Sequence, residues 1–143
     1  MPRGGEAGHV IADLGDGFEA TYAMAFLMAA ERLQVAAEPG AKGHHDLKGS
    51  EFLIFGGDLA YPDATVKEYQ ERCIEPYSYA FAVEQPTRKL FYFAGNHDWY
   101  DGLAAFTSVF CAARDRISKG LGKQIGGWRC QQHRSYFALK LPY

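Results

Sequence analysis

The chain has 143 residues and a mass of 15.9 kDa, the size of one domain with room for a substantial core. Hydrophobic residues make up 48% and charged residues 22%, and the formal net charge is -2, with neither sign running in blocks. This composition is typical of a globular protein and excludes recognition of a polyanion such as nucleic acid through bulk positive charge.

Cysteine usage and hydropathy favour a cytoplasmic protein. Cys73, Cys111 and Cys130 stand far apart and form no CxxC pair, which is typical of reduced thiols rather than a disulfide framework or a zinc site. The longest apolar run, Ala23 to Ala30, is far shorter than the roughly 20 residues that span a bilayer. The first ten residues contain no signal-peptide core. We therefore expect no membrane segment in this chain.

Short apolar segments alternate with segments of helical composition. We expect strands at 9–12, 51–55, 88–94 and 134–141. We expect helices at 18–38, from Val66 to about Ala82 with a capping box at Thr65 and Glu68, and at 103–117. The polar stretch 37–50 and the glycine-rich stretch 118–128 are expected to be loops. This alternation predicts an α/β fold with a mainly parallel sheet flanked by helices.

Each of the first three expected strands ends in a glycine-rich turn that contains Asp: ADLGDG, FGGDLAYP and AGNHDWYDG. Ligands of open α/β sheets bind beyond the carboxyl ends of the strands, so these turns should converge on one edge. They carry Asp13, Asp16, Asp58, Tyr61, Asn96, His97 and Asp98. This oxygen-rich set with one imidazole suits Mn, Fe or Zn ions, and a cation would relieve the repulsion between the carboxylates.

Glycines in these turns support a ligand site. Gly56, Gly57 and Gly95 permit tight turns and are expected to let the backbone approach an ion or a phosphate.

The motifs GGDLAYP and, after a helix, AGNHDWY, with DLG upstream, resemble those of the calcineurin-like metallophosphoesterase superfamily. Tyr61 stands three residues after Asp58, which is more similar to purple acid phosphatases than to Ser/Thr protein phosphatases, whose Asp-Arg-Gly continuation is absent from this sequence. The stretch from DLGDGFEATYA to GGWRCQQHRSYFALKLP also resembles large, mostly uncharacterised bacterial members of the superfamily.

The resemblance implies phosphoester hydrolysis at a dinuclear centre of Mn, Fe or Zn ions. By that resemblance Asp13 binds the first metal, Asp58 bridges both and Asn96 binds the second. Tyr61 adds a phenolate to the first metal, because Gly15 stands where many relatives have a metal-binding His.

The family also implies catalytic roles for His97 and Asp98. His97 faces the substrate, where it hydrogen-bonds a phosphate oxygen or protonates the leaving alkoxide, and Asp98 orients its ring.

Plainer readings of the same residues stay open at this point. Asp13 and Asp58 are also residues that favour turns, and Tyr61 before Pro62 is also placed to pack over a turn. Asp16 directly precedes the helical run and is expected to be its N-cap rather than a ligand.

Other histidines are expected to lie outside the site. His44 and His45 fall in a polar loop and are expected to be solvated, and His133 matches no metal motif of the family.

The resemblance covers almost the whole chain but only the amino-terminal part of the family's domain. We therefore expect residues 1–143 to form a single incomplete metallophosphoesterase domain of the two-sheet α/β sandwich type. Relatives complete the site with three further histidines, which have no counterpart here. Two hypotheses follow. In the first, the chain supplies the amino-terminal half of a phosphoesterase site and needs a carboxy-terminal half or a partner chain. In the second, it is a non-catalytic remnant that binds metal or phosphate, or pairs with another chain.

Overall fold

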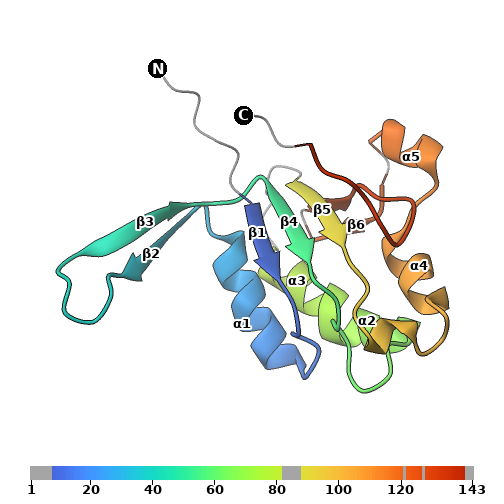
Figure 1. Ribbon diagram of the computed structural model, residues 1–143, viewed down its shortest axis with the longest axis horizontal. Helices are drawn as coiled ribbons and strands as arrows, with labels where there is room; N and C mark the ends of the chain where they lie inside the picture. Colours follow the sequence, from blue (N-terminus) through green and yellow to red (C-terminus); the bar gives the residue numbers. More distant parts are fainter. Residues whose placement is uncertain (1–7, 82–87, 121, 127, 141–143) are drawn as a thin grey trace.

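A computed structural model describes residues 8–81, 88–120, 122–126 and 128–140 (Figure 1). Five strands form one sheet in the order β1-β4-β5-β7-β6, and two further strands form a separate hairpin. Pairing is parallel from β1 to β7 along this order, and only β6 runs antiparallel to its neighbour β7. The strands are β1 Gly8–Ile11, β2 Arg32–Ala36, β3 His44–Lys48, β4 Phe52–Phe55, β5 Arg88–Tyr92, β6 Gln124–Ile125 and β7 Trp128–Cys130.

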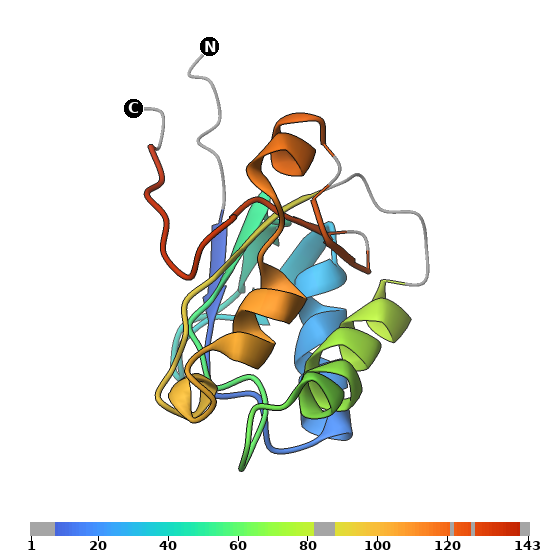
Figure 2. The same cartoon turned by 90° about the vertical axis from the view of Figure 1, so that its right-hand side faces the viewer.

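Most of the helical residues cover one face of this sheet (Figure 2). The helices are α1 Phe18–Ala29, α2 Val66–Tyr69, the π-helical turn η1 Gln70–Ile74, α3 Glu75–Ala80, the 3-10 turn η2 His97–Trp99, α4 Ala104–Phe110 and α5 Arg114–Ser118. Leu53, Phe55, Leu90 and Tyr92 point to the helical side and are buried in the core. The α/β class and the mostly parallel sheet predicted from the sequence are confirmed.

The opposite face of the sheet is covered less completely. Val10, Ile54 and Phe91 share this face by their register, and Val10 is 71% exposed. On the same face but farther from β1, the ring of Phe137 packs on Phe91 and Phe93, with ring-centroid distances of 4.9 and 4.6 Å. Within the described residues, the carboxy-terminal segment therefore packs on this face beside β5 and leaves Val10 of β1 exposed.

The expected helix over 18–38 and the expected loop over 37–50 are both wrong in part. The helix ends at Ala29, and Arg32–Ala36 pairs antiparallel with His44–Lys48 as a hairpin that projects from the body (Figure 1). Ala, Leu, Gln and Glu favour helix, but the polar and apolar residues of 32–35 alternate as in a strand. Gly40 and Gly43, with φ of 96° and 112°, make the reversal that closes the hairpin.

The expected helix over 103–117 is interrupted. Cys111 and Ala113 adopt extended conformations, with ψ of 143° and 140°, and separate α4 from α5. The N–H of Ala112 donates to the carbonyl of Gln132 at 3.1 Å. A contact with a distant segment therefore replaces the helical hydrogen bonds that local composition favours.

The last expected strand is also wrong. Residues 134–140 form no strand, and residue 141 lies outside the described residues. The final strand is Trp128–Cys130, which begins at the last residue of the expected loop 118–128, and the short strand Gln124–Ile125 lies inside that loop. Gln132 explains why pairing with β5 ends early: its side-chain Oε1 accepts from the N–H of Tyr92 at 2.5 Å and its Nε2 donates to the carbonyl of Tyr92 at 2.9 Å. A side-chain amide thus takes the place of a strand backbone.

The helix expected from Val66 begins there, and its expected end at Ala82 lies outside the described residues. Thr65 caps it by accepting from the N–H of Glu68 at 3.1 Å, as predicted.

The prediction that Asp16 is the N-cap of α1 is wrong. The N-cap is Gly17, and no side-chain hydrogen bond from the N-cap residue caps this helix.

The three cysteine thiols are free, as their spacing predicted, and all three are buried. None of the helices in the described part of the chain is long and apolar enough to cross a membrane.

Candidate metal centre

Three turns meet at the carboxyl edge of the sheet, after the neighbouring strands β1, β4 and β5. The turns after β1 and β4 are joined by the N–H of Asp13, which donates to the carbonyl of Gly57 at 3.2 Å. The turns after β4 and β5 are joined by the N–H of His97, which donates to Oδ1 of Asp58 at 3.0 Å. The predicted convergence of these three turns is confirmed.

Asp13 and Asp58 both adopt the left-handed backbone conformation, with φ of 57° and 53°. Side chains disfavour this region, and Asp is among the few non-glycine residues that adopt it readily. Each carboxylate therefore sits at the corner of a sharp turn. The prediction that Asp13 and Asp58 are turn residues is therefore correct for their backbone. A turn position still leaves the two side chains available to bind a ligand.

Close contact between turns explains two of the glycines. A Cβ on Gly57 would lie 2.3 Å from the backbone nitrogen of Gly95, and a Cβ on Gly95 would lie 2.3 Å from Oδ1 of Asp58. Neither distance is compatible with a side chain. These glycines thus let the two turns pack on each other, whereas the sequence suggested that they make room for a ligand.

Asp98 is a buried hub beneath the site, with 2% of its surface exposed. Its Oδ2 accepts from the N–H groups of Asp58 at 3.0 Å and Gly95 at 2.6 Å, and its Oδ1 accepts from the hydroxyl of Tyr69. Burial and the bond to Asp98 raise the pKa of Tyr69 well above its usual value, so the phenol stays a donor. Asp98 therefore fixes the turns after β4 and β5 to each other and to α2.

His97 is oriented by a group other than the one expected. Its Nδ1 lies 2.7 Å from the carbonyl of Pro62, and because a carbonyl only accepts, Nδ1 carries the proton of this bond. The ring also packs edge-on against Tyr61, with centroids 4.6 Å apart. Asp98 was expected to orient this ring, but its carboxylate is engaged by Asp58, Gly95 and Tyr69. Because Nδ1 is bonded to the carbonyl of Pro62, Nε2 is the ring nitrogen that remains for a hydrogen bond to a ligand.

Tyr61 brings its hydroxyl to the first predicted metal ligand. The phenol donates to Oδ1 of Asp13 at 3.0 Å. Desolvation, this hydrogen bond and the negative charges of Asp58, Asp13 and Asp16 raise the pKa of Tyr61 to about 12. At neutral pH the phenol is therefore protonated in the metal-free protein, and ligation as a phenolate requires a cation strong enough to displace that proton.

Gly15 has no space for a side chain. A Cβ there would lie 2.5 Å from the backbone nitrogen of Ala60 and 2.7 Å from Cδ2 of Tyr61. Tyr61 therefore packs over the turn and also contacts Asp13. The predicted packing role and the predicted ligand role of Tyr61 are compatible.

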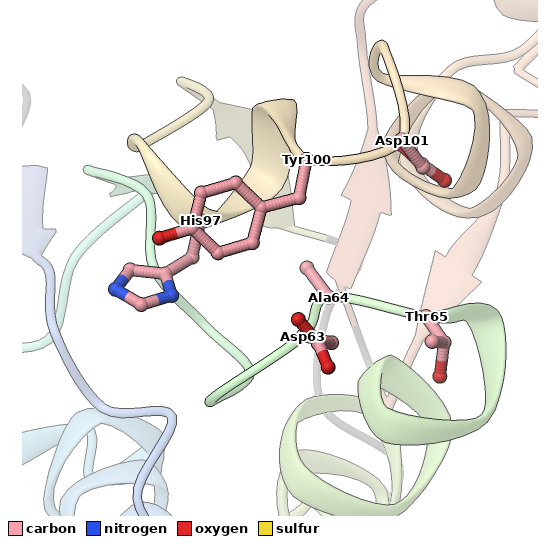
Figure 3. A pocket seen from close by; sticks show the side chains of 6 residues that line it. All are labelled: Asp63, Ala64, Thr65, His97, Tyr100 and Asp101. Atoms are coloured by element: carbon pink, nitrogen blue, oxygen red, sulfur yellow. The ribbon is translucent and has the colours of Figure 1, made fainter.

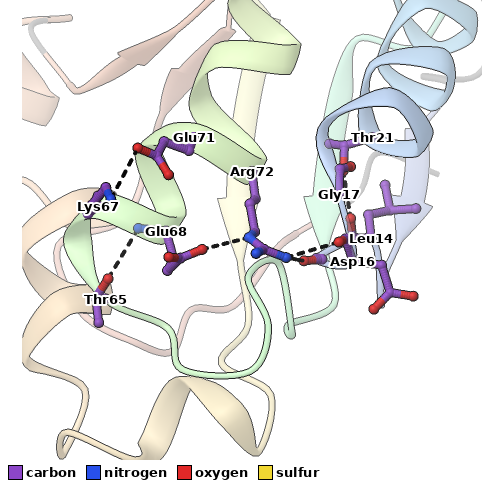
Figure 4. A network of polar contacts seen from close by, with 10 residues as sticks. Leu14, Asp16, Gly17, Thr21, Thr65, Lys67, Glu68, Glu71 and Arg72 are labelled. Carbon is purple, nitrogen blue, oxygen red and sulfur yellow. Dashed lines mark hydrogen bonds and ion pairs between the residues drawn. The ribbon is translucent and has the colours of Figure 1, made fainter.

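Arg72 braces the turn that carries Asp13 (Figure 4). Its Nη1 donates to the carbonyls of Gly15 at 3.3 Å and Asp16 at 2.9 Å, and its Nε donates to Glu68 at 2.6 Å. The i,i+4 spacing of Glu68 and Arg72 indicates a helical ion pair, but no sequence signal indicates that Arg72 also reaches the first turn. Pro62 and Tyr69 were likewise missed, because a backbone carbonyl and a core phenol carry no motif.

Other polar candidates lie around or away from these turns. Asn96 follows β5 with an exposed side chain, and its carbonyl accepts from the N–H of Trp99 at 3.3 Å. His44 and His45 lie exposed in β3 of the projecting hairpin, and His133 is exposed after β7. The solvent exposure expected for His44 and His45 is confirmed, although they lie in a strand.

The residues predicted to bind metal at this edge are oxygen donors. Asp13, Tyr61, Asp58 and Asn96 offer oxygen atoms, which suit hard or intermediate cations. Among the residues that the structure describes, no group of three or more His, Cys, Asp or Glu side chains is arranged to hold a metal ion. The ligand set within this part of the chain is thus short of what tight transition-metal binding needs.

Comparisons of this chain with family models, with curated proteins and with solved structures found no match.

Proposed function

We propose that this chain acts in metal-dependent phosphoester hydrolysis and supplies the amino-terminal half of a dinuclear centre of the calcineurin-like metallophosphoesterase type. One observation carries the proposal. Two aspartates at left-handed turn corners and a histidine with its Nδ1 held by a carbonyl meet at the carboxyl edge of three parallel strands. The amino-acid motifs of these turns add the family resemblance.

In this proposal Asp13 and Tyr61 hold the first metal, Asp58 bridges both and Asn96 holds the second. Bound Mn, Fe or Zn ions would supply the charge that activates water and stabilises the phosphoryl transition state. The hydrogen bond from His97 N–H to Asp58 Oδ1 holds the carboxylate of Asp58 in one orientation. Asp58 is 8% exposed, so its position is set by the fold.

His97 is proposed to donate a proton to the leaving oxygen. The Pro62 carbonyl fixes one ring nitrogen, so a proton can leave or arrive only at Nε2. The donating form of the ring then carries protons on both nitrogens. Asp98 contributes indirectly, because it fixes the turn from which His97 projects.

The experiment loads the chain, completed with a carboxy-terminal half that carries the missing histidines, with Mn²⁺ and measures hydrolysis of two phosphomonoesters, p-nitrophenyl phosphate and an unactivated alkyl phosphate. His97→Ala should lower kcat by roughly 10²–10⁴-fold on the alkyl ester, the usual contribution of a general acid, and less on p-nitrophenyl phosphate, whose leaving group needs no proton. Asp115→Asn, a matched change on exposed α5, should leave both rates unchanged. Equal losses on the two esters would refute the acid role.

A second candidate is a non-catalytic chain that binds metal or phosphate, or that pairs with another chain. The small number of metal donors in the described residues favours it. In that case Mn²⁺ should bind at Asp58 with no turnover of either ester, and Asp58→Asn should abolish binding.

A further inference from the structure

A pocket lies beside His97, outside the predicted ligand set (Figure 3). It has a volume of about 280 Å³ and is lined by Asp63, Ala64, Thr65, His97, Tyr100 and Asp101. Its walls come from the turn before α2 and from the segment between η2 and α4. The volume is large enough for a small organic group.

The pocket is acidic and has one aromatic wall. Asp63 and Asp101 are its two carboxylates, and none of the six described residues that line it is Lys or Arg. Tyr100 is 63% exposed, and its ring centroid lies 5.0 Å from that of His97. An exposed aromatic face beside a carboxylate is the combination that binds organic ammonium groups.

Two contacts hold these walls in place. Oδ1 and Oδ2 of Asp101 accept from the N–H groups of Ala104 and Ala105 at 3.0 and 2.8 Å. On the other wall, the carbonyl of Asp63 accepts from the N–H of Thr65 at 2.9 Å, and Thr65 caps the helix that follows. The negative charges are therefore presented by a fixed backbone.

We propose that this pocket binds the leaving group of the substrate, and that it selects phosphoesters of amino alcohols, whose leaving group carries an ammonium charge. The inference rests on the proposed function, because it needs His97 to protonate the leaving oxygen. In hydrolysis the bond from phosphorus to that oxygen breaks while the oxygen of water bonds to phosphorus. The leaving oxygen takes the Nε2 proton, and the proton that the water loses is returned to Nε2 through solvent. The group attached to that oxygen must then lie next to His97, where the pocket is.

Anionic leaving groups are disfavoured by the same walls. A nucleotide or an acidic peptide would bring negative charge to Asp63 and Asp101, and like charges repel in a partly desolvated pocket. A neutral alkyl group would bring no positive charge to the two carboxylates and would gain no Coulomb attraction from them.

The binding test uses choline and its uncharged isostere 3,3-dimethyl-1-butanol as probes of the full chain. Ring NMR signals of His97 and Tyr100 should shift with choline in a saturable way, with affinity about fivefold or more above that of the isostere. Asp63→Asn and Tyr100→Leu should each weaken choline binding by about three- to fivefold, whereas Asp115→Asn and Tyr136→Leu should not. Equal affinity for choline and the isostere, or unchanged binding in both pocket variants, would overturn the inference.

A kinetic test separates this inference from the proposed function. For the same Mn²⁺-loaded chain completed with a carboxy-terminal half, kcat/KM for choline phosphate should exceed that for 3,3-dimethylbutyl phosphate by about fivefold, and Asp63→Asn should remove the difference. If p-nitrophenyl phosphate is hydrolysed but these two esters react equally, the leaving-group inference fails alone. If no ester is hydrolysed while choline still binds through Asp63 and Tyr100, the proposed function fails and the pocket stands as an ammonium site.

Discussion

The candidate centre has two halves that are built differently. The buried half consists of Asp58, Tyr69, Gly95 and Asp98, and hydrogen bonds to the carboxylate of Asp98 tie it together. The exposed half consists of Asp13, Tyr61 and Asn96, in which one hydrogen bond joins Tyr61 to Asp13.

This difference separates positioning from binding. The buried half owes its geometry to the core, so changes there should first affect the stability of the whole domain. The exposed half makes few internal bonds, so its side chains are free to exchange a proton or a hydrogen bond for a cation. Substitutions in the two halves should therefore have effects of different kind as well as different size.

The largest effect is expected for Asp98→Ala. This change leaves the hydroxyl of Tyr69 and the N–H groups of Asp58 and Gly95 without their partner inside the protein, at a cost of about 3–5 kcal/mol in the free energy of unfolding. Urea denaturation measures it. Asp101→Ala is the control on the neighbouring turn, where loss of the helix-capping carboxylate should cost only about 1 kcal/mol. Similar losses of unfolding free energy for the two variants would mean that Asp98 does not hold the turns after β4 and β5 and α2 together.

A smaller effect is expected for Gly95→Ala. The new Cβ would meet Oδ1 of Asp58 at 2.3 Å, and relief of such an overlap costs about 1–3 kcal/mol. Gly17→Ala is the matched change near the exposed half, because Gly17 has φ of -178° and open space around the position of a Cβ. Urea denaturation of both variants should show the larger loss for Gly95→Ala, because Gly17→Ala changes only the N-cap of α1 and creates no overlap. A stable Gly95→Ala protein would show that the two turns do not pack as closely as described.

The smallest effect on stability is expected at Tyr61. Its pKa is raised from 10.0 in the unfolded chain to about 12 in the folded protein, so the folded state holds the phenol proton more tightly. The contribution of this pKa shift to the free energy of unfolding is therefore fully present below pH 10, and it is lost as the pH rises towards about 12. The difference in unfolding free energy between the metal-free wild type and Tyr61→Phe should shrink over this range. A difference independent of pH would contradict the bond to Asp13.

The buried strands and the turns that follow them could be predicted because local and global preferences agree there. Phe52–Phe55 is a continuous apolar run bounded by turn residues, and the parallel sheet needs such a run at its centre. The Asp and Gly residues that mark the turn after it are the ones that its left-handed conformations require. The same residues therefore predict both the fold and the edge of the sheet at which the candidate site lies.

The hairpin and the carboxy-terminal segment could not be predicted, because contacts between distant residues decide them. Arg32–Ala36 combines helical composition with the alternation of a strand, and pairing with His44–Lys48 decides between the two. Gln132 ends the pairing along β5 through its side chain, which no periodicity reveals. The orientation of His97 by the Pro62 carbonyl is of the same kind, since a backbone acceptor leaves no signature in the sequence.

The central claim is that the turns after β1, β4 and β5 form a cation site, and Mn²⁺ titration followed by NMR tests it most directly. Paramagnetic Mn²⁺ broadens the signals of nuclei close to it, so the first amides to broaden should be those of Asp13, Asp58, Tyr61 and Asn96. Asp58→Asn keeps an oxygen for the N–H of His97 but removes the charge, and it should abolish this local broadening, whereas Asp115→Asn should not. Broadening spread over the acidic surface, or broadening that survives Asp58→Asn, would contradict the account.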